Sequence, residues 1–323
     1  MPFTTDRLAQ RILTVLLLLG LAVTAAAQEE TSEYAQRFDF AWQLVNDRYW
    51  DLDAVGVDWE AVGERYRPQA LAASSDEEFY ETVSRMYEEL GDDHSTFVAP
   101  SQVEEIHAEY GALPCLPVFS AFSLPTHAQA SFETLPSGVQ YRTYDEIGYL
   151  KLPDLASNGV TRDVREAVQE LTEAGSQALI LDLRGNPGGR LVEMMQVAGV
   201  FTGGFLWRVV TSWSFPLPYP AIGATATDLP LVVLTDSNVH SAAEGLAGAL
   251  QARGRAITIG ETTAGNVEAV LPFCLADGSQ AWIATGVLAP VGGPTWEGQG
   301  VEPDIPAAAD DALESALEYL REG

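Results

Sequence analysis

Residues 178–189 have the sequence Ala178-Leu-Ile-Leu-Asp-Leu-Arg-Gly-Asn-Pro-Gly-Gly189. The first six are almost wholly apolar, which is typical of a strand buried on both faces of a parallel sheet. Gly188 and Gly189 then precede a helical pattern that begins at about residue 191. Backbone N–H groups at such a turn can bind an anion or an oxyanion. The alternative is a turn that needs glycine only for its positive φ.

The alternation of strands and helices continues on both sides of this stretch. Further strands are expected over 147–152, 229–234 and 256–260, and helices over 160–171, 191–200 and 241–253. Strands near 267–273 and 280–288 and a closing helix over 309–321 complete the pattern. Such alternation predicts an α/β domain over 146–323 with right-handed crossovers. Active sites in open α/β sheets gather at the carboxyl ends of the strands.

The region before this domain has a different character. Residues 34–90 show apolar residues at helical spacing, and Ser75 with Glu78 forms a capping box before the last of three expected helices. We therefore expect an N-terminal helical domain over 28–100. Residues 101–145 contain several prolines and little periodicity. They predict an irregular connector with a few short strands.

The first 27 residues are expected to be a secretory signal peptide. Arg7 and Arg11 precede an apolar stretch over 12–23, and three alanines at 25–27 form a small-residue cleavage site. A transmembrane anchor is the alternative, but the apolar run is shorter than the roughly twenty residues needed to span a bilayer. The sequence thus predicts a secreted or periplasmic protein with no membrane insertion after removal of the signal.

The charge and the cysteine content of the sequence limit which partners and which cross-links the protein can have. The 323 residues include 17 basic and 46 acidic residues, for a formal net charge of −29. A surface this acidic repels phosphate, so nucleic acid is excluded as a partner. Lys151 is the one lysine, and Cys115 and Cys274 are the two cysteines. In an exported protein these cysteines can form a disulfide, or they can be two separate thiols. No oligomeric state is predicted.

A candidate nucleophile follows the expected strand over 229–234. Ser241 lies in the stretch Asp236-Ser-Asn-Val-His-Ser-Ala-Ala-Glu244, at the start of a helix. Its hydroxyl would lie beside free N–H groups and the positive end of the helix dipole, which suits a nucleophile whose adduct carries an oxyanion. The alternative is structural, because Ser241 and Glu244 also have the spacing of a capping box.

A nucleophilic serine needs a base. His94, in the loop Gly91-Asp-Asp-His-Ser95, is the candidate, because His240 adjoins Ser241 too closely in sequence to deprotonate it. No histidine pair has the spacing of a metal site such as H-E-x-x-H, which disfavours a zinc hydrolase. We expect neither a metal nor a cofactor.

Four blocks together resemble the C-terminal processing (tail-specific) proteases and the tricorn protease core. They are Leu90-Gly-Asp-Asp-His-Ser95, Leu181-Asp-Leu-Arg-Gly-Asn-Pro-Gly-Gly189, Ser241-Ala-Ala-Glu244 and Gly300-Val-Glu-Pro-Asp-Ile305. The resemblance covers about residues 34–100 and 146–322. It implies a ClpP/crotonase-like α/β core and Ser241 as the nucleophile. It also implies an oxyanion site formed by the N–H of Ala242 and that of Gly188 or Gly189.

The sequence departs from the processing proteases at two places. About 45 residues of connector stand where that branch usually has a PDZ domain. Asn266 follows Gly260-Glu-Thr-Thr-Ala-Gly265, where the branch has the lysine of a Ser-Lys dyad. The tricorn-like branch instead uses a serine, a histidine and a glutamate, and His94 and Glu297 match the last two. Asp93 could orient His94 or be a solvated loop acid, and Glu297 could be one surface acid among many.

These observations predict an exported serine endopeptidase of the tricorn-like branch, without a PDZ domain. Its substrates would be peptides or unfolded proteins, cleaved through an acyl-enzyme. The alternative is a catalytically inactive relative that binds peptides or small apolar ligands in the same cleft, and Asn266 favours that alternative.

Overall fold

The computed structural model describes residues 33–110, 133–212 and 214–322. The predicted signal peptide and Cys115 lie outside these residues. The chain divides into two compact units, Met1–Val103 with Phe273–Ile283, and Glu104–Pro272 with Ala284–Gly323. The first contains the expected helical domain and, in addition, a distant segment around residue 278. The predicted domain boundaries themselves stay a prediction.

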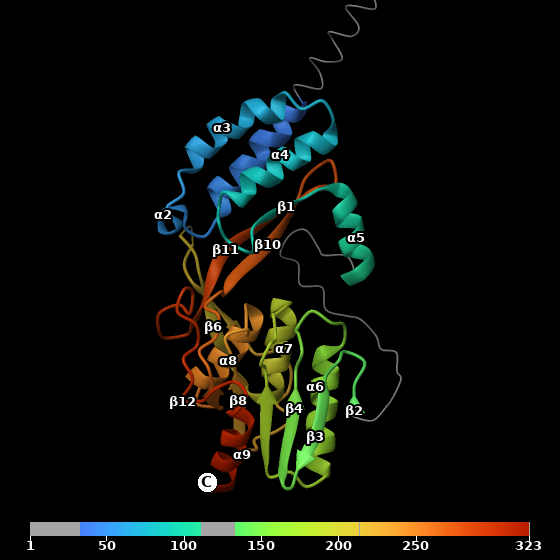
Figure 1. Cartoon of the computed structure of the whole chain (residues 1–323), viewed down its shortest axis with the longest axis vertical. Coiled ribbons are helices and arrows are strands. Elements are labelled where there is room, and N and C mark those ends of the chain that lie inside the picture. Colours follow the sequence, from blue (N-terminus) through green and yellow to red (C-terminus); the bar gives the residue numbers. More distant parts are fainter. Residues whose placement is uncertain (1–32, 111–132, 213, 323) are drawn as a thin grey trace, which may run out of the picture. The chain divides into compact units, whose positions relative to one another are not determined.

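The first unit is built from helices over residues 33–48, Leu52–Val55 (α2), Trp59–Leu71 (α3) and Asp76–Glu88 (α4) (Figure 1). Ser75 caps α4, as its sequence predicts, because the Glu78 N–H donates to Ser75 Oγ at 3.3 Å. The helices are held together by aromatic side chains. The indoles of Trp42 and Trp59 each donate to the other residue's carbonyl oxygen, at 2.9 and 3.0 Å.

The strand residues of the first unit come from two distant parts of the chain. β1 (Thr96–Val98) pairs with the first residues of β11 (Gln280–Pro290). The turn between β10 (Glu268–Cys274) and β11 is fixed by Asp277, which accepts hydrogen bonds from Tyr80 Oη at 3.1 Å and Ser279 Oγ at 2.6 Å. Cys274 is disulfide-bonded. Because Cys115 is not among the described residues, the Cys115–Cys274 bridge stays a prediction.

The second unit has a seven-stranded sheet in the order β12-β9-β8-β5-β4-β3-β2. The neighbours from β12 to β4 are parallel, and β2 and β3 add an antiparallel edge. The strand bounds are Glu133–Thr134 (β2), Gln140–Tyr144 (β3), Ile147–Lys151 (β4), Ala178–Asp182 (β5), Leu231–Thr235 (β8), Ile257–Gly260 (β9) and Ile305–Pro306 (β12). All five residues of β5 and of β8 are buried, as their apolar sequences predict.

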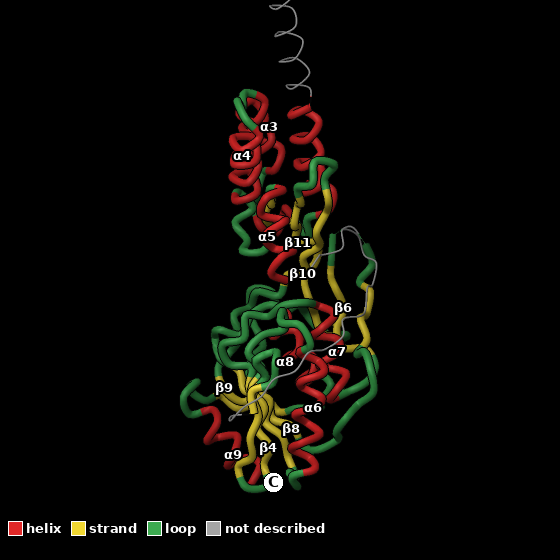
Figure 2. The backbone as a smooth tube through the Cα atoms, turned by 90° about the vertical axis from the view of Figure 1, so that its right-hand side faces the viewer, coloured by secondary structure: helices red, strands yellow, loops and turns green. Residues whose placement is uncertain are grey.

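Helices cover both faces of this sheet (Figure 2). One face packs on α6 (Val160–Glu173), α7 (Leu191–Phe201) and α8 (Ala242–Ala252) in the main apolar core. The other packs on α9 (Ala312–Glu322) in a smaller core. This arrangement confirms the predicted α/β core with an N-terminal helical region.

Several elements differ from the sequence-based expectation. Pro100–Tyr110 forms a helix, α5, where an irregular connector was expected. Phe205–Val210 (β6) and Leu217–Pro220 (β7) form strands that were not predicted, and β6 pairs with the last residues of β11. β7 contains two prolines and no alternating polar residues, so its sequence lacks the usual strand signal.

Asp182, at the end of β5, is fully buried and tightly bound. It accepts hydrogen bonds from Tyr149 Oη at 2.7 Å and from Arg184 Nε at 2.9 Å and Nη2 at 2.6 Å. Burial acts to raise the pKa of Asp182, but the contacts with Arg184 and Tyr149 outweigh it and the net pKa is lowered. A lowered pKa in the folded state stabilises the fold above the unfolded-state pKa, and this stabilisation is lost as pH falls through the folded pKa.

The Asp182→Asn variant is therefore expected to lower the free energy of unfolding by about 3 kcal/mol at pH 7. The loss should shrink as the pH falls through the lowered folded-state pKa of Asp182, where the wild-type carboxylate itself becomes protonated. Urea unfolding at pH 7 and at the lowest pH at which the wild-type chain stays folded measures this. Asp145→Asn is the control, because Asp145 is exposed and its 3.4 Å contact with Arg321 is a surface ion pair. An equal loss from Asp182→Asn at both pH values would contradict the prediction.

Candidate active site

Ser241 adopts a conformation that is unusual for a residue with a side chain. It lies between β8 and α8 with φ 52° and ψ −122°. Its backbone N–H donates to Asn266 O at 2.8 Å and to Glu244 Oε2 at 3.1 Å. Such backbone strain persists only where surrounding contacts enforce it, and it is common at active sites. The sequence placed Ser241 at this helix start, but the strained φ is a finding of the structure.

Glu244 is the residue that enforces this conformation. It is fully buried in the first turn of α8. Its Oε1 accepts from Thr263 Oγ1 and from the Gly265 N–H, both at 2.6 Å, and its Oε2 accepts from the N–H groups of Asn266 at 2.9 Å and Ser241. The Glu244 half of the predicted capping box is thus present. Its carboxylate also fixes the segment 263–266 against the nucleophile candidate.

The Glu244→Gln variant is expected to lower kcat at least about tenfold, with a smaller change in KM. An amide offers one acceptor oxygen and turns its NH₂ group toward hydrogen-bond donors, so buried N–H groups lose their partner at about 1–3 kcal/mol. Steady-state kinetics on the substrate class that the sequence predicts measure kcat and KM separately. Glu261→Gln is the control, since its amide oxygen can keep the single contact with the Ala309 N–H. A change in KM alone would argue against a positioning role for Glu244.

The glycine loop after β5 lies directly against Ser241. A Cβ on Gly188 would meet Ser241 Cβ at 2.9 Å and the Ala242 nitrogen at 3.0 Å, so only glycine fits there. The Gly188 N–H is already occupied, because it donates to Asn186 Oδ1 at 2.8 Å. The buried side chain of Asn186 also donates to Leu152 O at 2.9 Å. Sequence reasoning missed Asn186, although its asparagine between two loop glycines was a visible turn signal.

Two N–H groups beside Ser241 remain available. Among the described residues, no acceptor is found for the N–H of Ala242 or of Gly189. The Gly188 carbonyl accepts from the Leu155 N–H at 2.8 Å. Because a trans peptide directs its N–H opposite to its C=O, the Gly189 N–H points away from Leu155. Of the two glycines predicted for the oxyanion site, Gly189 is therefore the one whose N–H has no acceptor among the described residues. Gly188 contributes by having no side chain, which lets the loop approach Ser241.

Glu297 lies close to Ser241 because both residues are hydrogen-bonded to the segment 266–267. Glu297 Oε2 accepts from the Val267 N–H at 2.7 Å, and the neighbouring Gly298 N–H donates to Gly265 O at 2.7 Å. Since Asn266 O and Val267 N belong to one planar peptide unit, Glu297 Oε2 lies at most about 8 Å from the Ser241 nitrogen. The structure thus brings together two predicted site residues that are far apart in sequence.

His94 belongs to the first unit, so its pairing with Ser241 stays a prediction. Its loop is ordered by Asp92, whose Oδ1 accepts from the N–H groups of His94, at 2.8 Å, and Ser95, and whose Oδ2 accepts from Tyr49 Oη at 2.9 Å. Asp93 is exposed, and no partner for its carboxylate is found among the described residues. Sequence reasoning considered Asp93 and missed Asp92. An aspartate whose side chain binds N–H groups two and three residues ahead is a common turn motif.

Lys151 and Asn266 occupy different surroundings. Lys151 ends β4 opposite Asp182, and strand alternation places it with Tyr149 on the face that packs on α9. Ser241 begins α8, which packs on the opposite face. Asn266 instead lies beside Ser241, and its Oδ1 is buried with no hydrogen-bond donor among the described residues.

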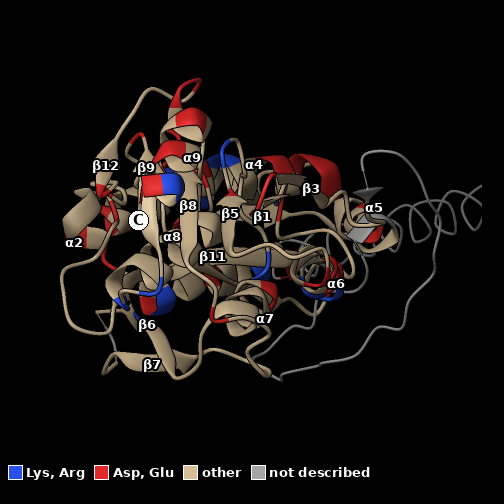
Figure 3. Cartoon of the chain, turned by 90° about the horizontal axis from the view of Figure 1, so that it is seen from below, with Lys and Arg blue, Asp and Glu red and all other residues tan. Residues whose placement is uncertain are grey.

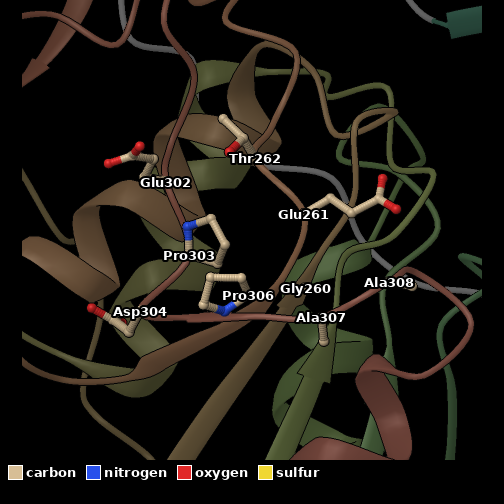
Figure 4. A pocket seen from close by; sticks show the side chains of 9 residues that line it. All are labelled: Gly260, Glu261, Thr262, Glu302, Pro303, Asp304, Pro306, Ala307 and Ala308. Carbon is tan, nitrogen blue, oxygen red and sulfur yellow. The ribbon is translucent and has the colours of Figure 1, made fainter.

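A pocket of about 670 Å³ in the second unit holds none of these side chains. It lies along β9 and β12 and is lined by Gly260, Glu261, Thr262, Glu302, Pro303, Asp304, Pro306, Ala307 and Ala308 (Figure 4). Figure 4 shows the Glu261 side chain directed away from those of Glu302 and Asp304, so the carboxylates do not converge.

No group of three metal-ligating side chains occurs within 33–110, 133–212 and 214–322. No helix in that part of the chain is long and apolar enough to cross a membrane.

Comparisons with solved structures show the same fold in proteins of low sequence identity. A photosystem II D1 C-terminal processing protease matches with a TM-score of 0.64 and 20% identity, over 86% of this chain and 93% of that chain. A lipoprotein from Streptococcus agalactiae matches with a TM-score of 0.67 and 18% identity, over 90% and 96% of the two chains.

Comparisons of sequence identify the family. A carboxyl-terminal-processing protease of Picosynechococcus sp. is 36% identical over 137 residues, which are 42% of this chain and 33% of that protein. A tricorn protease homolog 1 of Streptomyces coelicolor is 33% identical over 72 residues, 22% of this chain and 7% of that protein. The chain spans about a third of the length of the processing proteases it matches. The tricorn protease C1 domain matches residues 31–88, and the profile of peptidase family S41 matches residues 146–307. The chain belongs to peptidase family S41.

Proposed function

We propose that the chain is an exported serine endopeptidase that cleaves peptides or unfolded proteins through an acyl-enzyme. One observation carries the proposal. Ser241 is held at a strained φ of 52° beside the unpaired N–H of Ala242, at the carboxyl end of a buried parallel strand. A hydroxyl in that position can attack a carbonyl whose developing oxyanion meets N–H donors at once. Membership of peptidase family S41 supports the same reaction class.

The reaction would use groups from both units. Ser241 Oγ attacks the peptide carbonyl, and His94 takes the hydroxyl proton and later returns it to the leaving amine. The N–H groups of Ala242 and Gly189 bind the oxyanion of the tetrahedral intermediate. Glu297 supports His94 by stabilising its protonated form. Water then hydrolyses the ester at Ser241 by the same steps.

Asp92 and Asp93 would have different roles near His94. Its carboxylate binds backbone N–H groups of the His94 loop and the hydroxyl of Tyr49, so it positions the loop rather than the imidazole. Asp93, exposed and next to His94, remains a candidate for orienting the imidazole when a substrate is bound. The geometry of the loop favours Asp92 as the structurally more important of the two.

The rival function is binding without catalysis, and Asn266 favours it. A fluorophosphonate probe separates the two, because it reacts covalently only with an activated serine. We expect labelling at Ser241, located by peptide mass spectrometry, and no labelling of Ser241→Ala. A well-folded wild-type protein that stays unlabelled would support the non-catalytic binder.

Export is the second part of the proposal, and it is motivated by the basic, apolar and small-residue segments within residues 1–27. N-terminal sequencing of protein from its native host should give a chain that begins at Gln28. An N-terminus at Met1 in the mature protein would refute export through this signal.

A further inference from the structure

Two segments that are far apart in sequence, 263–266 and 297–301, lie in close contact within the second unit. The first accepts the N–H of the nucleophile candidate, and the second carries the acid proposed to support the base. A Cβ on Gly265 would meet the Gly300 nitrogen at 2.8 Å, and a Cβ on Gly300 would collide with the Thr263 carbonyl oxygen. Glycine at both positions therefore lets the two backbones touch.

The Thr263 side chain connects these segments to the helix of the nucleophile. Its Oγ1 donates to Glu244 Oε1 at 2.6 Å and accepts from the Val301 N–H at 2.7 Å. The Thr263 N–H also donates to the Val301 carbonyl at 3.3 Å. Thr263 is 5% exposed, so water cannot readily replace a partner that is lost. One buried hydroxyl thus joins the first turn of α8 to the segment 297–301.

A hydroxyl is the donor type that this connection requires. The acidic residues of α4 and α9 lie at the surface (Figure 3), whereas Glu244 is fully buried and needs hydrogen-bond donors. Three of its four donors are backbone N–H groups, and the fourth is the Thr263 hydroxyl. An N–H group cannot accept a hydrogen bond, but a hydroxyl can donate one and accept another. Thr263 can therefore bind both the carboxylate and the Val301 N–H.

We propose that Thr263 is a positioning residue for the peptidase reaction, which holds Ser241 and Glu297 in one fixed arrangement. The inference rests on the proposed function. Glu244 fixes the backbone of Ser241, and Val301 ends the segment that carries Glu297. The hydroxyl between Glu244 and Val301 makes the two positions depend on one another. Misplacement of reacting groups by about 1 Å can lower a rate by about 100-fold.

The rate constant of fluorophosphonate labelling at Ser241 tests this role without a known substrate. Thr263→Val keeps the shape of the side chain but removes the hydroxyl, so it should label at least about tenfold more slowly than the wild-type chain. Thr263→Ala, which adds no methyl group beside the Glu244 carboxylate, is a second variant with the same expected result. Thr263→Ser keeps the hydroxyl and should label close to the wild-type rate.

Thr258→Val is the matched control, because it removes a buried hydroxyl that also donates and accepts. Thr258 is fully buried on β9, and its Oγ1 donates to Asp304 Oδ2 at 2.9 Å and accepts from the Asp304 N–H at 3.0 Å. This variant should unfold at a lower temperature than the wild-type chain and still label at the wild-type rate. A loss of stability is thereby separated from a loss of position.

Two results would overturn the inference and leave the proposed function standing. One is labelling of the folded Thr263→Val and Thr263→Ala variants at the wild-type rate. The other is an equal slowing of labelling in Thr258→Val, which would reduce the role of Thr263 to stability. A folded wild-type chain that is not labelled would overturn the proposed function, and the inference with it. Circular dichroism and thermal unfolding establish that each variant is folded.

Discussion

Ser241→Ala is expected to lower kcat by about 10³-fold to 10⁶-fold while the protein stays folded. The variant removes only the hydroxyl, because the contacts of Ser241 with Asn266 and Glu244 run through its backbone N–H. Alanine tolerates the positive φ no worse than serine does, so the strained loop should survive. The measurement is kcat on an unstructured protein substrate, together with fluorophosphonate labelling.

Two further variants make this result specific. Ser237→Ala changes an exposed serine of the same loop and should keep wild-type turnover. Ser241→Gly should be as inactive as Ser241→Ala but more resistant to unfolding, because glycine adopts this backbone conformation without the cost of about 1–3 kcal/mol that it imposes on a residue with a side chain. A folded Ser241→Ala that kept more than a tenth of wild-type kcat would exclude Ser241 as the nucleophile.

His94→Ala should cost about as much as Ser241→Ala, whereas Lys151→Ala should leave most of the activity. Imidazole titrates near neutral pH and suits a general base. Lys151, the one lysine, lies on the sheet face that packs on α9, away from the α8 face where Ser241 lies. The double variant Ser241→Ala/His94→Ala should be little worse than either single one, because groups that act as a unit give non-additive losses. Steady-state kinetics of the four variants measure this.

His107→Ala serves as the control for histidine loss, since His107 lies on α5 and is also half-buried. Circular dichroism comes first. The loop around His94 should persist in His94→Ala, because Asp92 binds the backbone N–H and not the imidazole. If folded His94→Ala turned over at near the wild-type rate, or if Lys151→Ala lost activity, the base would not be His94.

Local sequence patterns were sufficient for the order of the core elements. The continuous apolar runs of β5 and β8 and the helical spacing in α6 and α7 predict these elements, because burial on both faces of a parallel sheet leaves little choice of residue. The same holds for Ser241, since a polar residue directly after a buried strand and before a helix must lie at the carboxyl edge of the sheet.

Local patterns did not predict the strands β6 and β7 or the details of the loops. β6 and β7 depend on pairing with each other and with the distant β11, and such contacts leave no periodic signal in a proline-rich stretch. Asp92 rather than Asp93 orders the loop around His94, because only the folded loop places one carboxylate within reach of two N–H groups.

The sequence by itself determined which chemistry is available: a serine at a helix start, a glycine loop after a buried strand, one histidine in a helix-end loop, and a surface that is strongly acidic. Tertiary structure decided which groups are free to act. It occupied the Gly188 N–H and left that of Gly189 unpaired, it bound Glu244 to four donors, and it brought Glu297 to the segment that holds Ser241. The physical reason is that a residue type is fixed locally, whereas a hydrogen-bond partner comes from a segment that only folding brings near.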